Sequence, residues 1–339
     1  MLLAAVALST PFAGFTPNGM AATATYSESA AVHRAEGPGC HGSASANSDD
    51  PVPIGIWHAN GFNEVLVGVC VAGRGPFPFL IDSGAEVSVI SRSLARSLRL
   101  SPTGGPVTIA AIGCNEQASD VTVRSWSMGG IELANQSLVE LNFPATLRRD
   151  VDGVIGSDVL ARFGAVRIDY RSQELALERG ESPQFQIVIS TEKPTKVPTV
   201  PALLGDTNPT PIPLSVIESP LQVSVATVVY LNGLPELFAV DTGASISIIT
   251  KGISSTFTPV GRDFEGESAG CSVGGPEVQS GAWSAGAVHL APQALGVVEL
   301  PASIFAKGLL GSDVFFEKGI LVIDYQNARM YLGDENARV

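Results

Sequence analysis

The sequence is poor in the residues that build metal centres and disulfide frameworks. Only 4 cysteines and 4 histidines occur among its 339 residues. Four cysteines are too few for a disulfide framework. The histidines have no spacing with cysteine or acidic residues that would make a metal site. We therefore expect a protein that works without a metal or another cofactor.

Positive charge and long apolar runs are also scarce. Lysine and arginine number 20 against 33 aspartates and glutamates, which gives a net charge of −13. This excess of negative charge argues against nucleic acid and anionic membrane surfaces as partners. No internal apolar run approaches the roughly 20 residues of a membrane span. The 36 glycines and 23 prolines, in a chain that is 45% hydrophobic, indicate a compact protein of short strands and tight turns.

Three stretches differ in composition from the rest of the chain. Residues 1–24 form a possible signal peptide, because the start is apolar and Ala22-Thr23-Ala24 offers a small-residue cleavage site, although a basic leader is missing. Residues 25–59 are rich in small residues, which predicts a flexible tether. The proline-rich residues 181–215 predict a stiff, extended linker. We expect a secreted or periplasmic protein, and a disordered cytosolic tail is the alternative.

The most informative feature is a motif that occurs twice. The apolar run that ends in Asp82-Ser83-Gly84-Ala85 recurs before Asp241-Thr242-Gly243-Ala244, and each follows a hairpin signal. Each aspartate thus stands at the tip of a buried strand, where the glycine lets the backbone turn and donate hydrogen bonds at close range. Two such carboxylates that share one proton are a known device for activating water. The pattern therefore favours hydrolysis.

Further landmarks follow in the same order in both halves of the chain. Twelve residues separate a cysteine from a tryptophan in each half (114 to 126 and 271 to 283). An apolar pair with a glycine follows the first aspartate by 74 residues (82 to 156) and the second by 70 (241 to 311). Chance similarity does not preserve order and spacing together. We therefore infer a duplicated domain over residues 60–180 and 216–335.

With Val154-Ile155-Gly156 and Leu309-Leu310-Gly311 after the two motifs, both halves resemble retropepsin-like domains of the aspartic protease clan. The resemblance implies an all-β fold with two pseudo-symmetric retropepsin-like lobes, each a closed β-barrel or sandwich with a flap hairpin and a short helix. It implies that Asp82 and Asp241 are the catalytic residues of one site. The residues expected to support this dyad are Ser83, Gly84, Thr242 and Gly243.

The resemblance also implies substrate-covering flaps near residues 109–115 and 267–272. Gly113 and Gly270 would make the flap tips mobile, and backbone groups there and at Cys114 and Cys271 would bind substrate as an added strand. The two cysteines occupy equivalent positions. They either approach each other and form a disulfide in an oxidising compartment, or they are small apolar residues inherited by duplication. We favour the second interpretation.

Other acidic residues have simpler interpretations. Asp158 and Asp313 stand in Gly-Ser-Asp before apolar residues, which predicts helix N-caps. Asp169 and Asp324 precede tyrosine at a strand end, which predicts turns. Glu86 directly follows the first motif and would raise the pKa of the dyad if it points inward.

Three functional interpretations follow from these patterns. The first is an endopeptidase whose single site forms within one chain, a monomer with an internal pseudo-dimer that acts on peptides or proteins. The second is a peptide-binding module on the same fold whose dyad is idle. The third is catalysis at a site assembled between chains.

Overall fold

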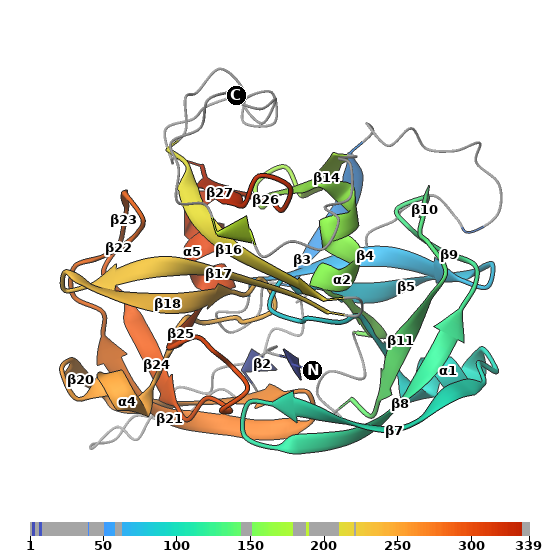
Figure 1. Ribbon diagram of the computed structural model, residues 1–339, viewed down its shortest axis with the longest axis horizontal. Coiled ribbons are helices and arrows are strands. Elements are labelled where there is room, and N and C mark those ends of the chain that lie inside the picture. Colours follow the sequence, from blue (N-terminus) through green and yellow to red (C-terminus); the bar gives the residue numbers. More distant parts are fainter. Residues whose placement is uncertain are drawn as a thin grey trace, which may run out of the picture.

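The computed structural model (Figure 1) describes residues 2–3, 7–8, 40, 51–57, 63–143, 151–178, 188–189, 210–219 and 222–333. The fold class expected from the sequence is confirmed, because the protein is all-β and its main sheet nearly closes into a barrel. The elements of the first half are β3 (Val52–Trp57), β4 (Glu64–Val71), β5 (Arg74–Ile81), β6 (Val89–Ser91), α1 (Arg92–Ser97), β7 (Pro102–Ala111), β8 (Asn115–Val123), β9 (Trp126–Met128), β10 (Ile131–Glu132), β11 (Gln136–Leu141), β12 (Gly153–Ile155), α2 (Ser157–Leu160), the 3-10 helix η2 (Ala161–Phe163), β13 (Ala165–Asp169) and β14 (Glu174–Glu178).

The second half repeats much of this order. Its elements are β16 (Ile212–Ser219), β17 (Gln222–Leu231), β18 (Leu234–Val240), β19 (Ile248–Thr250), α4 (Lys251–Ser254), β20 (Thr258–Ser268), β21 (Cys271–Gln279), β22 (Trp283–Ala285), β23 (Val288–Leu290), β24 (Ala294–Val298), β25 (Gly308–Leu310), α5 (Ser312–Lys318), β26 (Ile320–Asp324) and β27 (Arg329–Leu332). Three two-residue strands complete the set: β1 (Leu2–Leu3), β2 (Ala7–Leu8) and β15 (Val188–Ile189).

Corresponding strands of the two halves take the same partners. The hairpin β4–β5 continues into a parallel pairing of β5 with β12, and the hairpin β17–β18 into a parallel pairing of β18 with β25. The hairpin turns follow the sequence, since Gly73 and Gly233 have φ values of 70° and 83°, in the left-handed region that two-residue hairpin loops require. The aspartate-bearing strands β5 and β18 are therefore each held between a hairpin partner and a parallel partner.

A small antiparallel sheet joins the halves. Strand β13 pairs antiparallel with β26, and β14 and β27 extend the sheet on either side. β3 and β16 reach the edges of this sheet from the main barrel. In Figure 1 this sheet lies at the top of the molecule, the aspartate-bearing hairpins lie in the middle and the hairpins β7–β8 and β20–β21 lie at the bottom.

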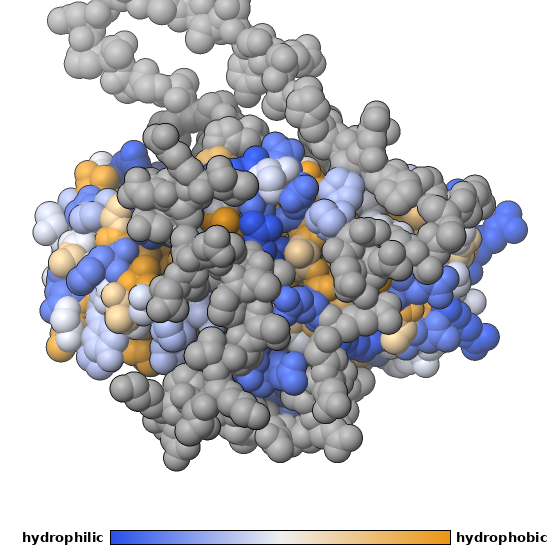
Figure 2. All heavy atoms as spheres, turned by 90° about the horizontal axis from the view of Figure 1, so that it is seen from above, coloured by the Kyte–Doolittle hydropathy of each residue, from blue (hydrophilic) through white to orange (hydrophobic). Residues whose placement is uncertain are grey.

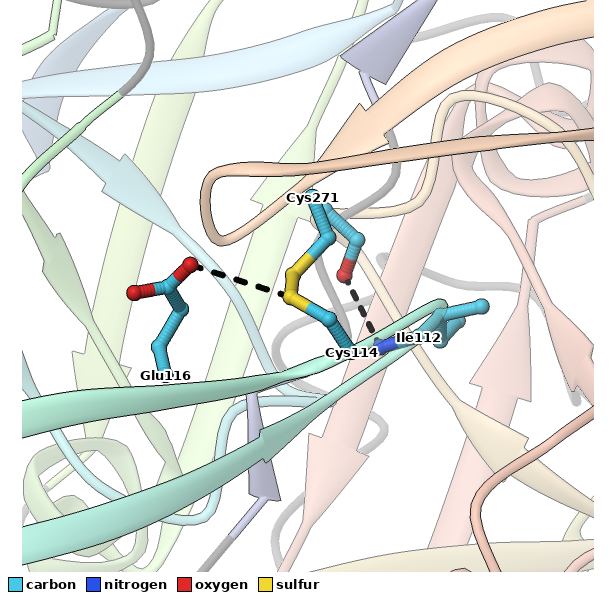
Figure 3. Close-up of a disulfide and its surroundings, with 5 residues drawn as sticks. Ile112, Cys114, Glu116 and Cys271 are labelled. Atoms are coloured by element: carbon cyan, nitrogen blue, oxygen red, sulfur yellow. Dashed lines mark hydrogen bonds between the residues drawn. A yellow bond between two sulfur atoms is a disulfide. The ribbon is translucent and has the colours of Figure 1, made fainter.

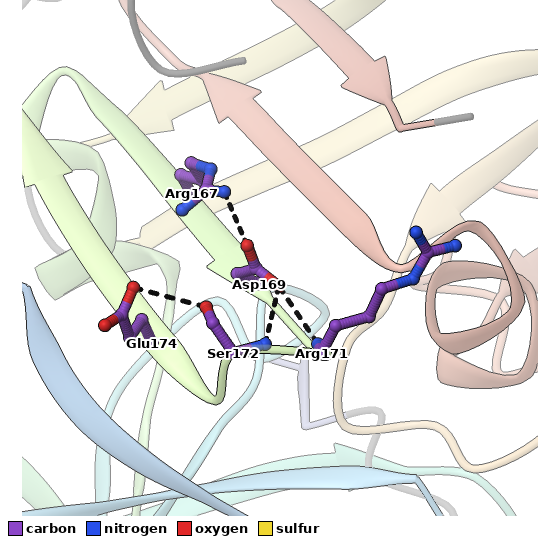
Figure 4. Close-up of polar contacts among 5 residues, drawn as sticks. All are labelled: Arg167, Asp169, Arg171, Ser172 and Glu174. Atoms are coloured by element: carbon purple, nitrogen blue, oxygen red, sulfur yellow. Dashed lines mark hydrogen bonds and ion pairs between the residues drawn. The ribbon is translucent and has the colours of Figure 1, made fainter. Parts of the chain in front are cut away.

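The turns after β13 and β26 are held by the two aspartates expected there. Asp169 Oδ1 accepts hydrogen bonds from the backbone N–H groups of Arg171 and Ser172, both at 3.0 Å, and Arg167 pairs with the other carboxyl oxygen at 2.5 Å (Figure 4). Asp324 Oδ1 accepts from the N–H of Asn327 at 2.9 Å. The turn interpretation of both aspartates is confirmed.

Parts of the predicted signal peptide, tether and linker form β-strands. β3 lies in residues 25–59, which the sequence predicted as a flexible tether, and its backbone pairs with β4 and β14. The six residues of β3 supplied too short an apolar signal to outweigh the small residues around them. Strands β1 and β2 lie within the predicted signal peptide, and β15 and the start of β16 within the predicted linker. The rest of these three stretches lies largely outside the described residues.

The main core contains apolar side chains of both halves, and three smaller clusters among the described residues lie beside it. Among its largest fully buried members are Phe79, Phe238, Phe315 and Tyr325. Seen from above, the described surface carries interspersed hydrophilic and hydrophobic residues (Figure 2). Within the described residues, no helix has the length and apolar character needed to cross a membrane.

Candidate active site

The two aspartates occupy equivalent places at the ends of β5 and β18. The backbone N–H of Asp82 donates to the carbonyl of Ile155 at 3.0 Å, and that of Asp241 to the carbonyl of Leu310 at 3.0 Å. Both side chains are 0% exposed. The apolar strands β12 and β25 thus hold the two aspartates from the side, as the second apolar motif of each half predicted.

Each carboxyl group is oriented by its own motif. Asp82 Oδ1 accepts hydrogen bonds from the N–H groups of Gly84 and Ala85, both at 2.9 Å. Asp241 Oδ1 accepts in the same way from Gly243 and Ala244, at 3.0 and 2.9 Å. The other oxygen, Oδ2, is buried in both residues and receives no N–H or O–H from the described residues. Hydrogen bonds therefore fix Oδ1 of each aspartate, and Oδ2 of each remains available to bind a ligand.

The glycines of the motifs bring the two carboxyl groups together. A Cβ atom added to Gly84 would lie 2.4 Å from Cγ of Asp241, and one added to Gly243 would lie 2.5 Å from Cγ of Asp82. Any larger residue would collide with the opposite carboxyl group. The glycines are required for this close approach, because neither has a backbone conformation reserved for glycine.

Hydroxyl groups lock the two motifs to each other. Thr242 Oγ1 donates to the carbonyl of Ile81 at 2.8 Å and accepts from the N–H of Ser83 at 3.0 Å. Ser83 Oγ donates to the carbonyl of Val240 at 2.8 Å and accepts from the N–H of Thr242 at 3.2 Å. The structure thus brings together all six residues predicted at the dyad.

Burial raises the pKa of both carboxyl groups, and the proximity of Asp82 adds to the rise at Asp241. Desolvation by burial raises the pKa of Asp82 to about 6, although the N–H groups of Ala85 and Gly84 and the interaction with Asp241 lower it. Desolvation and the nearby charge of Asp82 raise the pKa of Asp241 well above its ordinary value. Two carboxyl groups this close cannot both ionise comfortably, so the pair shares one proton.

The helix after each apolar motif donates a hydrogen bond to the loop of the dyad. Ser157 Oγ donates to the carbonyl of Ser83 at 2.8 Å, and Ser312 Oγ donates to the carbonyl of Thr242 at 2.7 Å. Both serines are completely buried. Neither serine was predicted from the sequence, although the Gly-Ser-Asp pattern common to both halves carried the signal.

The N-cap interpretation of Asp158 and Asp313 is wrong, because the caps of α2 and α5 are the preceding glycines. Asp158 instead accepts a hydrogen bond from Ser88 Oγ at 2.6 Å. Asp313 accepts one from Ser247 Oγ at 2.7 Å. Each aspartate therefore holds the strand that leaves the dyad motif, a long-range contact that local spacing does not reveal.

The two predicted flaps are the hairpins β7–β8 and β20–β21, and their tips are joined. Cys114 and Cys271 form a disulfide with 5.9 Å between their Cα atoms, and the N–H of Ile112 donates to Ser268 Oγ at 3.3 Å (Figure 3). The preferred interpretation of two inherited apolar residues is therefore wrong. Cys40 and Cys70 form a second bridge, so all four cysteines are paired. The small number of cysteines led us to expect no disulfide framework, yet two bridges are enough to connect distant segments.

Both flap tips turn at a glycine. Gly113 and Gly270 have φ values of 92° and 97°, in the left-handed region that favours glycine. Glu116 Oε1 lies 3.7 Å from Cys114 Sγ. Among the described residues this carboxylate and the two sulfurs are close enough together to be considered for a metal, but sulfurs bonded to each other offer no thiolate ligand.

The inner edges of both flaps pair with the start of the chain. Leu2 and Leu3 lie parallel to β7, in register with Ala110 and Ala111. Ala7 and Leu8 lie antiparallel to β20, in register with Glu267 and Gly266. The two short strands thus pair with equivalent strands of the two flaps in opposite directions.

Comparison with known proteins bears on the first half of the chain. Residues 67–159 match the family model described as aspartyl protease. The matched range contains Asp82, the first flap and the apolar motif that supports Asp82. The match supports an aspartyl protease family and a protease-type function for this chain. No curated protein matches the sequence.

Proposed function

We propose that the protein is an aspartic endopeptidase, in which a water molecule held between Asp82 and Asp241 attacks the peptide bond. The single observation that carries the proposal is the pair of buried Oδ2 atoms, both without a donor among the described residues. Their carboxyl groups can approach closely because Gly84 and Gly243 have no side chain. Such a pair holds one proton between two oxygens and activates water without a metal. Aspartic proteases are the well-established case of this chemistry.

The dyad works with one shared proton, and we assign the role of base to Asp82 and the role of proton donor to Asp241. Asp82 takes the proton of the attacking water, while Asp241 stays protonated and donates a hydrogen bond to the substrate carbonyl. That donor stabilises the oxyanion that develops in the transition state. The proton on Asp241 is then available for the departing nitrogen.

The flaps favour a polypeptide as the substrate. Their inner strands already accept an extended segment as an added strand, through Leu2–Leu3 on one flap and Ala7–Leu8 on the other. Main-chain pairing of this kind gives affinity for extended peptides irrespective of most side chains. We infer that substrate lies between the flaps and the dyad in the same manner.

The equivalent pairings around β5 and β18 support two retropepsin-like lobes that arose by duplication, with the site within one chain. We propose a monomeric enzyme, and sedimentation that finds activity only in an oligomer would contradict this. The two disulfides support export to a secreted or periplasmic location, where such bonds persist. No nucleic-acid or membrane partner is proposed.

The test is cleavage of a diverse peptide mixture by the full chain between pH 3 and 8, with products identified by mass spectrometry. Asp82→Asn and Asp241→Asn serve as matched variants, because each keeps the shape of the carboxyl group and removes its charge. We expect cleavage by the parent and loss of at least about 1,000-fold in both variants. Equal cleavage by parent and variants would assign the activity to a contaminant.

The second candidate is a peptide-binding module with an idle dyad, which the strand pairing on the flaps favours. In that case the folded parent cleaves nothing and binds peptides as well as the asparagine variants do. Binding by fluorescence anisotropy, measured beside the cleavage assay, separates the two functions.

A further inference from the structure

A third carboxyl group stands next to the dyad. β4 pairs with β5 so that Leu66 faces Leu80, and two residues further along this antiparallel register Glu64 comes opposite Asp82. In the second half Ala226 faces Ala239, and the same step brings Ser224 opposite Asp241. Glu64 and Ser224 therefore occupy equivalent positions, each across from a catalytic aspartate.

The residues that follow the two motifs complete the pattern. Glu86 and Ser245 each come four positions after their aspartate. Ser245 Oγ donates to Glu64 Oε1 at 2.6 Å, and Ser224 Oγ donates to Glu86 Oε1 at 2.5 Å. Each hydrogen bond joins a strand of one half to the motif loop of the other. The two contacts are equivalent, but the glutamate and the serine have changed places.

This exchange gives the two glutamates different surroundings. Glu64 is 0% exposed, and its Oε2 receives no hydrogen bond from the described residues. Glu86 lies at an intermediate depth. The first half therefore has a buried carboxyl group beside its aspartate, whereas the second half has a neutral hydroxyl there.

Within the part of the chain that the structure describes, no lysine or arginine pairs with Glu64. β3, which pairs with β4 at Trp57 and Glu64, contains no ionisable residue. The segment from Thr242 to Thr250, which supplies Ser245, contains none either. The charged group that acts on Glu64 is Asp82. Burial, and to a smaller extent the charge of Asp82, raise the pKa of Glu64 to about 8, although the Ser245 hydroxyl lowers it.

We propose that Glu64 is a positioning residue that assigns the roles within the dyad, and that its ionisation sets the alkaline limit of hydrolysis. This role rests on the proposed function. While Glu64 is protonated, Asp82 is the member of the dyad that ionises. When Glu64 loses its proton, a negative charge beside Asp82 drives the shared proton from Asp241 onto Asp82. The base is then protonated, and the hydrogen-bond donor for the substrate carbonyl is lost.

The test compares the pH dependence of kcat/KM for the full chain, Glu64→Gln and Glu86→Gln between pH 4 and 10. Glutamine keeps the shape of the side chain and the acceptor for Ser245 but cannot ionise. We expect Glu64→Gln to move the alkaline midpoint upward by about one pH unit or more. Glu86→Gln, its counterpart across the pseudo-twofold axis, should leave the midpoint in place. The midpoint does not depend on the absolute rate, so a merely structural effect of the substitution would not move it.

An unmoved midpoint in Glu64→Gln, or an equal movement in Glu86→Gln, would overturn this role and leave the proposed function intact. Absence of cleavage by the parent at every pH would overturn the proposed function itself. If Glu64→Gln does not fold, Ser245→Ala provides the same test. It removes a hydrogen bond that favours the ionised form of Glu64, so the midpoint again moves upward.

Discussion

Replacement of Thr242 by valine tests whether the hydroxyl lock holds the two halves together. The two side chains have nearly the same shape, so the change removes the Oγ1 contacts and little else. Those contacts are the donation to the Ile81 carbonyl at 2.8 Å and the acceptance from the Ser83 N–H at 3.0 Å. Both backbone groups belong to the first half of the chain and are buried.

Each backbone group left without a partner costs about 1–3 kcal/mol. Two such groups predict that Thr242→Val lowers the free energy of unfolding by about 2–6 kcal/mol. Urea unfolding followed by tryptophan fluorescence measures this change. Thr242→Ser is the matched control, because it keeps the hydroxyl and removes one methyl group, at about 1 kcal/mol or less.

A loss below about 1 kcal/mol in Thr242→Val, or equal losses in the valine and serine variants, would refute the reasoning. The first result would mean that the lock does not stabilise the folded chain. The second would mean that the methyl group and not the hydroxyl stabilises it.

Three further predictions concern other parts of the site. Gly84→Ala should reduce kcat/KM at least about 100-fold in the peptide assay, because its Cβ would lie 2.4 Å from Cγ of Asp241 and displace the dyad; an active alanine variant would contradict the close approach. The pKa of Glu64, raised by burial from 4.5 to about 8, means that its contribution to folding is complete below about pH 4.5 and is lost as the pH rises towards 8. The free energy of unfolding of the parent relative to Glu64→Gln should therefore fall over this range by at most about 1.4 kcal/mol per pH unit, and a flat difference would contradict the shift. Finally, Cys271→Ser should speed amide hydrogen exchange at the tips of both flaps while β13 and β26 stay protected, and unchanged exchange at the tips would show that the bridge does not restrain them.

The sequence predicted the parts of the site that are encoded locally. The dyad, its glycines and hydroxyl residues, the apolar motifs and the flaps all follow from short patterns that recur at matching distances. Duplication made these patterns recognisable, because each half supported the interpretation of the other.

The remaining features depend on contacts that no local pattern contains. Asp158 and Asp313 have the spacing of helix caps, yet their partners are serines about seventy residues away in the chain. Glu64 begins an apolar strand and gave no indication of its partner, since Ser245 belongs to the other half. The one available signal was a charged residue amid apolar ones. Only the register of β4 with β5 shows that Glu64 lies opposite Asp82.

The bond between Cys114 and Cys271 also determines the topology of the site. From Cys114 the backbone leads back to Ser83, whose hydroxyl is bonded to the second half, and from Thr242 it leads on to Cys271. With the disulfide these segments form a closed ring. Under the proposed function a polypeptide between the flaps and the dyad passes through that ring, so it enters and leaves by one of its ends. A head-to-tail cyclic peptide has no end to insert, and it should become a substrate only after the bridge is reduced.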